Sequence, residues 1–112
     1  MATHANALLT ATPYVVPLLP QNQEFDIALA GQSYHLVVRW NSFSNSWILD
    51  VEDSQRNPLV SGIPMVTGCD LLEQYQYVGI AGAFLVQSTN DPDLVPDYSS
   101  LGSTGNLFFM VP

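Results

Sequence analysis

Apolar and polar side chains alternate with a period of two in three consecutive segments of the chain. In residues 24–29, 33–40 and 47–52 every second side chain is apolar, the pattern of strands that bury one face. Short segments rich in glycine, serine, asparagine and proline separate them and favour tight turns. We therefore predict a three-stranded antiparallel meander. Its buried face carries the candidate core residues Phe25, Ile27, Leu36, Val38, Trp40, Trp47, Leu49 and Val51.

The segments on either side of this meander are extended but less regular. Prolines at positions 13, 17 and 20 fit an edge segment and exclude a helix or a central strand. Residues 58–66 predict a short extended piece. Residues 68–77 predict one helical turn, in which Asp70 is the cap and Leu71, Leu72 and Tyr75 share a face. A buried strand is expected over residues 77–87, a turn-rich loop over 88–105 and a last apolar strand over 106–112.

These six or seven strands predict an all-β fold. We expect a small antiparallel meander that forms a sandwich or a partly open barrel, with at most one short helix. A chain of 112 residues is long enough for one domain with a modest core. We expect residues 1–12, in which small side chains predominate, to be an N-terminal arm, flexible or ordered on assembly. Residues 13–112 are expected to form a single β domain.

The charge balance excludes several classes of function. The chain has ten acidic residues and only two basic ones, Arg39 and Arg56, which gives a net charge of −8 at pH 7. Such a chain repels nucleic acids and anionic membranes, so we expect no specific nucleic-acid binding.

No apolar run approaches the ~20 residues that span a bilayer. The first 20 residues lack the basic start and continuous apolar core of a signal peptide, so we expect synthesis in a cytoplasm and no membrane insertion.

Charged residues make up only 11% of the chain, against about a quarter in typical domains. A small domain with so few surface charges is expected to be covered by partners or by further copies of itself. The alternative is the uncharged polar surface of a secreted protein.

The segment of residues 35–53 holds the most conspicuous group of ionisable side chains. His35 and Arg39 lie on the polar face of one predicted strand, and Asp50 and Glu52 lie on the polar face of the next. We expect a solvated sheet face on which Arg39 pairs with one of the acids, worth about 0.2–1 kcal/mol. The sequence of this segment indicates neither a catalytic nucleophile nor a substrate pocket. We expect no catalytic residues and no enzymatic activity.

Metal and cofactor sites receive no support from the sequence. Cys69 is the only cysteine, which excludes an internal disulfide and a cysteine-based zinc site. The two histidines have no zinc-binding spacing. Three aspartates in residues 91–97 could hold calcium, but this loop lacks the central glycine and terminal glutamate of a calcium loop. We expect no metal and no cofactor.

Aromatic residues are numerous enough for a sugar-binding platform or for a protein interface. Both tryptophans lie on the apolar faces of their predicted strands and are expected to fill the core. Apolar and aromatic residues at the ends of the elements suit contacts with proteins. The candidate interface residues are Pro13, Pro17, Tyr75, Tyr77, Phe108 and Phe109.

The order of several short motifs resembles a known family. The motifs occupy residues 20–25 (PQNQEF), 40–41 (WN), 47–51 (WILDV) and 58–72 (PLVSGIPMVTGCDLL), with a looser match over 101–108. Residues 18–110 resemble the plug proteins of contractile-tailed phage baseplates, of the type described for cyanophages. Residues 1 to about 12 have no counterpart in the pattern.

The resemblance implies a structural virion protein without catalytic residues. Plugs of this family sit at the centre of the baseplate, close the distal end of the tail tube, and contact hub and spike proteins. Their place on an axis implies a symmetric homo-oligomer. A charge of −8 suits a lumen that must not bind the passing genome. The alternative function is a carbohydrate- or peptide-binding β-sandwich module.

Overall fold

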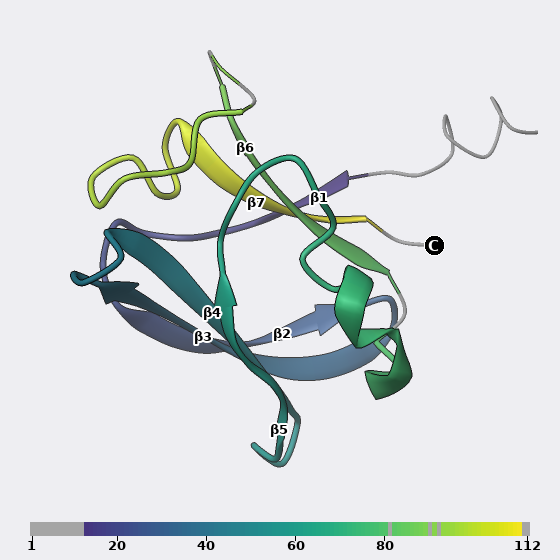
Figure 1. Ribbon diagram of the computed structural model, residues 1–112. Helices are drawn as coiled ribbons and strands as arrows, with labels where there is room; N and C mark the ends of the chain where they lie inside the picture. Colours follow the sequence, from purple (N-terminus) through teal and green to yellow (C-terminus); the bar gives the residue numbers. More distant parts are fainter. Residues whose placement is uncertain (1–12, 81, 90, 92, 111–112) are drawn as a thin grey trace, which may run out of the picture.

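The computed structural model describes residues 13–80, 82–89, 91 and 93–110. Within them the chain forms seven strands and one short 3₁₀-helix (Figure 1). The elements are β1 (Pro13–Val16), β2 (Gln23–Leu29), β3 (Gln32–Asn41), β4 (Ser46–Asp53), β5 (Pro58–Pro64), η1 (Glu73–Val78), β6 (Ala83–Ser88) and β7 (Gly105–Met110). The predicted all-β fold is confirmed.

The strands form two antiparallel sheets that pack as a sandwich. The first sheet has the order β2-β3-β4-β5. The three strands of the predicted meander are therefore joined by a fourth, β5, which lies within the predicted extended piece of residues 58–66. The second has the order β1-β7-β6 and joins the first strand of the chain to the last. Strand β1 lies at an edge of this sheet, as its prolines predict.

The register of the meander places the predicted apolar rows on one face. Phe25 lies opposite Leu36, Val38 opposite Leu49, and Trp40 opposite Trp47. Five of the candidate core residues are fully buried: Leu36, Val38, Trp47, Leu49 and Val51. The other three, Phe25, Ile27 and Trp40, are partly buried and pack against this core.

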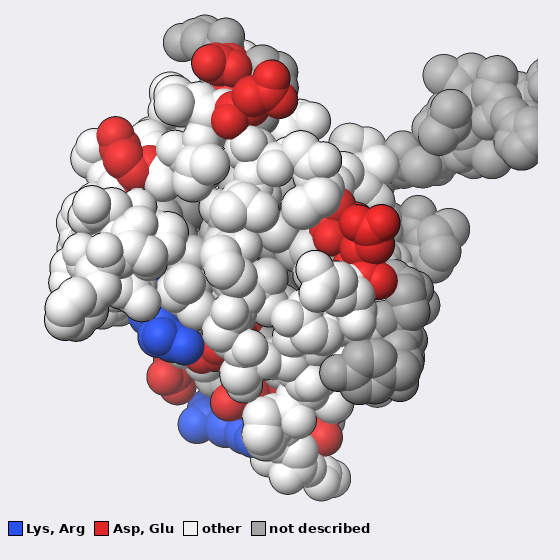
Figure 2. All heavy atoms as spheres, in the orientation of Figure 1, with Lys and Arg blue, Asp and Glu red and all other residues white. Residues whose placement is uncertain are grey.

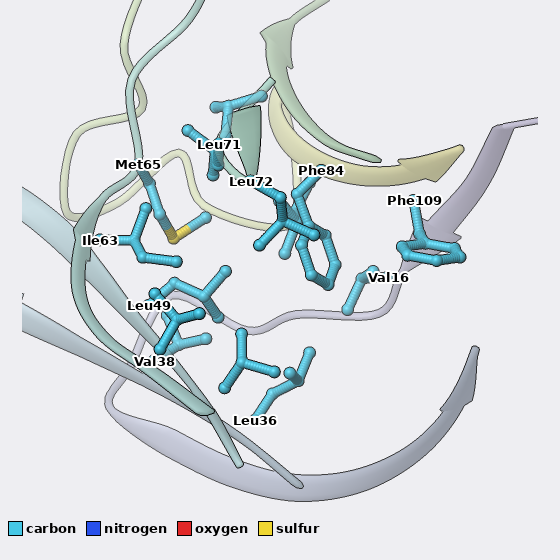
Figure 3. Close-up of a cluster of buried hydrophobic side chains, with 14 of the residues drawn as sticks. Val16, Leu36, Val38, Leu49, Ile63, Met65, Leu71, Leu72, Phe84 and Phe109 are labelled. Atoms are coloured by element: carbon cyan, nitrogen blue, oxygen red, sulfur yellow. The ribbon is translucent and has the colours of Figure 1, made fainter. Parts of the chain in front are cut away.

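The second sheet closes the core from the opposite side. Figure 3 shows Val16 from β1, Phe84 from β6 and Phe109 from β7 pointing towards the side chains of the meander. Phe84 and Phe109 meet edge to face, with ring centroids 5.2 Å apart. Each sheet alone would expose one apolar face, so their contact is what stabilises both.

The predicted strand over residues 77–87 is wrong in its first half. The chain forms η1 up to residue 78, and β6 begins only at Ala83. Gly79 and Gly82 have φ values of +85° and +128°, which are outside strand geometry and suit only glycine. Asp70 caps this region as predicted, because its Oδ1 accepts hydrogen bonds from the Leu72 amide at 2.9 Å and the Phe84 amide at 3.0 Å.

The loop before β7 lies directly against the chain between β1 and β2. Gly102 has a φ of +84°, and a Cβ at this position would overlap the carbonyl oxygen of Leu18. The close approach of these two backbones therefore requires glycine.

We expect Gly102→Ala to destabilise the domain by about 3 kcal/mol or more, because both backbone strain and overlap arise. Gly31 is the matched control: its φ is +78°, but a Cβ there meets nothing within 4 Å. Gly31→Ala should cost about 1 kcal/mol from strain alone. Denaturant unfolding of both variants measures the difference, and equal losses would contradict this account of the contact.

Candidate assembly surface

The outer face of the four-stranded sheet is polar and carries an ion-pair cluster. His35 is only 3% exposed, with its Nδ1 2.7 Å from Asp26 Oδ1 and its Nε2 3.4 Å from Glu24 Oε1. The prediction of a solvated His35 is wrong. Asp26 and Glu52 are its cross-strand neighbours on β2 and β4, so side chains from both adjacent strands flank the ring and cover it.

The two arginines are paired on the same side of the molecule. The Arg39 guanidinium donates to both carboxylate oxygens of Asp50, at 3.2 and 3.3 Å, which confirms the predicted cross-strand pair. Asp50 also accepts a hydrogen bond of 2.7 Å from the Gly62 amide. Arg56 lies 4.0 Å from Glu24. Figure 2 shows both basic side chains among acidic ones on one part of the surface.

The outer face of the three-stranded sheet is uncharged and mostly apolar, with Gln87 and Asn106 as its polar pair. Val15, Phe108 and Leu85 form one cross-strand row, and Pro13 and Met110 lie opposite each other in the next. We call these five residues the apolar face. A shallow hollow of about 230 Å³ lies between four of them and Gln87. Because no charged side chain belongs to it, the apolar face is chemically the opposite of the outer face of the meander.

The candidate interface residues separate in the structure. Pro13 and Phe108 belong to the apolar face. Pro17 is exposed in the connection to β2, and Tyr75 is half-buried against the core. The side chain of Tyr77 lies outside the described residues.

Phe109 was expected to be an interface residue, and that prediction is wrong. It is 1% exposed and packs on Phe84, so it belongs to the core. Adjacent residues of a strand point to opposite faces, and Phe108 therefore points outward. Val15, Leu85 and Met110 of the apolar face are not among the interface residues predicted from the sequence. The available signal was the continuous apolar run of β7, because a strand that is apolar on both faces is covered on both.

Three aromatic rings gather at one end of the sandwich. Trp40 and Trp47 meet edge to face at 5.2 Å, and Tyr98 stacks on Trp47 at 5.4 Å. Trp47 is fully buried, and its Nε1 donates a hydrogen bond of 2.9 Å to the Asp97 carbonyl oxygen. Trp47 therefore offers no face on which a sugar could stack, and its contacts fix the loop that carries Tyr98.

Asp97 fixes the loop that carries Tyr98. Its Oδ1 accepts hydrogen bonds from the backbone amides of Ser100 at 2.9 Å and Ser99 at 3.1 Å. The amide of Ser100 is the main cause that lowers the pKa of Asp97 below its ordinary value, because hydrogen bonds to a carboxylate favour its charged form. In the β4–β5 turn, the amide of Asn57 lowers the pKa of Asp53 in the same way.

A carboxyl group whose pKa is lowered by folding stabilises the folded state at pH values above its pKa in the unfolded chain, about 3.9. This contribution is lost as the pH falls through the folded value. We therefore expect Asp97→Asn to lower the melting temperature at neutral pH and to flatten its decline between about pH 5 and pH 3. Circular dichroism melts test this. Asp93→Asn in the same loop is the control, and parallel curves for Asp97→Asn and wild type would contradict the role of Asp97.

In the part of the chain that the structure describes, no three His, Cys, Asp or Glu side chains are arranged to hold a metal ion. No helix within these residues is long and apolar enough to cross a bilayer.

Comparison with known families identifies the family of the chain that carries this surface. A family model described as "Cyanophage baseplate Pam3 plug gp18" matches residues 14–112. The chain belongs to this family. The match covers both sheets, and it confirms the resemblance carried by the motifs from residue 20 onward. No curated protein matches the chain in sequence.

Membership of the plug family gives the chain its function: it is a structural plug of a phage baseplate and a component of the virion tail. A plug works by contact with other baseplate components, and the apolar face offers the chemistry for such contacts. The family match begins at residue 14, so residues 1–13 stand outside it.

Proposed function

We propose that this plug closes the distal end of the tail tube near the hub and spike, and that it acts by assembly rather than by catalysis. The observation that supports this proposal is the apolar face on β1, β6 and β7. A contiguous apolar surface on a small domain is typical of a protein interface. The charged outer face of the meander would remain in contact with water or with the lumen.

We further propose that several copies assemble symmetrically around the tube axis. A ring of acidic subunits multiplies a negative field that DNA does not bind, and ring contacts would cover much of each subunit. In this proposal the chain is made in the host cytoplasm and then incorporated into the tail.

Substitution of Phe108 tests whether the apolar face is an assembly contact. We expect Phe108→Gln to leave a folded protein but to reduce incorporation into tails about tenfold, because aromatic anchors dominate interface energies. Val37→Gln is the control: Val37 is half-buried, and its cross-strand partners Glu24 and Asp50 place it on the charged outer face.

The measurement is quantitative mass spectrometry of purified particles, with thermal unfolding of both variants as the check of folding. Normal incorporation of Phe108→Gln would show that the apolar face is not the contact.

Residues 1–12 form the second proposed contact. They contain no Asp, Glu, Lys or Arg, and residue 13 begins β1 at an edge of the apolar sheet. We propose that they are an arm that contacts a neighbouring subunit.

Deletion of residues 1–12 tests the proposed arm. We expect the shortened chain to keep its fold, because the core that the structure describes begins at Val16 and draws on both sheets, but to be absent from assembled baseplates. Circular dichroism checks the fold, and mass spectrometry of particles counts the copies. Normal assembly of the deletion variant would refute the arm.

A further inference from the structure

The turn between β3 and β4 presents an aromatic side chain entirely to solvent. Phe43 is 100% exposed, whereas the other large exposed apolar side chains of the described residues are at most 58% exposed. Isolated exposed apolar residues are common on protein surfaces. Phe43 differs from them in the rigidity and the charge of its surroundings.

Side-chain hydrogen bonds hold the turn in one shape. Asn41 Oδ1 accepts hydrogen bonds from the Phe43 amide at 2.9 Å and from the Ser44 amide at 3.3 Å. The hydroxyls of Ser44 and Ser46 are 2.6 Å apart. Asn45 takes the left-handed conformation, with a φ of +50°, which asparagine tolerates better than most residues. A turn ordered in advance loses little conformational entropy when it binds.

The base of the turn is equally fixed. Trp40 and Trp47 are cross-strand partners and pack edge to face. Tyr98, from the loop before β7, packs on both of their rings. The turn therefore projects from a cluster of three packed aromatic rings, and Phe43 stands at a defined position relative to it.

The turn carries no charge, in a chain of net charge −8. Residues 40–49 contain no Asp, Glu, Lys or Arg. The charged side chains nearest in sequence, Arg39 and Asp50, are paired with each other. Figure 2 shows the lobe beside β3 and β4 without acidic or basic side chains. Burial of this tip would thus leave no charge unpaired, which is the main cost of covering a polar surface.

We propose that Phe43 is an anchor that inserts into a recessed apolar pocket on another protein of the baseplate. An aromatic side chain surrounded by uncharged serine and asparagine suits an interface hot spot, in which energetically near-neutral contacts around a buried anchor exclude water. A glycan would need a broader exposed platform, and Trp47 is buried. An anionic membrane would repel the chain. The inference rests on the proposed function, in that the partner is a baseplate protein.

Substitution with a matched control tests the anchor. Phe43→Ser removes the ring, and Leu94→Ser removes a 58%-exposed side chain from another loop. We expect Phe43→Ser to reduce the copies per purified particle about tenfold or more, with no change in melting temperature, and Leu94→Ser to leave the copies unchanged. Equal incorporation of Phe43→Ser and wild type would overturn the anchor. Absence of the wild-type chain from tails would instead overturn the proposed function.

A photo-crosslinker identifies what surrounds the ring. With p-benzoylphenylalanine in place of Phe43, irradiated particles should contain one crosslinked product that joins this chain to a different baseplate protein at apolar residues. Products with other copies of this chain alone, or no product from particles that contain the chain, would overturn the proposal. Binding of wild type, but not of Phe43→Ser, to a glycan array would overturn it in favour of sugar recognition.

Discussion

The contact between the two sheets is the interaction on which the rest of the domain depends. Strands β1 and β7 come from opposite ends of the chain. A three-stranded sheet of short strands is stable only when a face of it is covered. Phe84 and Phe109 supply that face and lie against the meander (Figure 3). Once this contact forms, the loop before β7 is positioned, Gly102 meets Leu18, and Tyr98 reaches the tryptophans.

The same arrangement divides the surface into two chemically distinct sides. Each sheet has its inner face in the core, so the two outer faces are the broad surfaces that the domain offers to its surroundings. The meander presents acids and arginines, with His35 buried beneath Glu24 and Asp26, whereas the three-stranded sheet presents Phe108, Leu85 and their neighbours. In the proposed function, the apolar side contacts other baseplate proteins and the acidic side repels DNA, so the two sides have separate roles.

Much of this could be predicted from residue patterns. Alternation in residues 24–52 located three strands and their buried faces correctly, because side-chain direction along a strand is a local property. The cap at Asp70 and the pair between Arg39 and Asp50 were also correct, since both follow from short-range geometry. The failures concern Phe109, His35 and the start of β6. In each of them a neighbour distant in sequence, or a glycine conformation, decided the outcome.

The sequence by itself determined the all-β class, the apolar rows of the meander and the family to which the chain belongs. Only the tertiary structure decided that β7 lies between β1 and β6, that Phe108 points outward while Phe109 is buried, and that Phe43 stands on a rigid turn. The physical reason is the range of each interaction. Alternation specifies which way a side chain points relative to its own strand. Which strands become neighbours depends on contacts between distant segments, such as Pro13 and Met110, 97 residues apart, which emerge only when the two sheets pack.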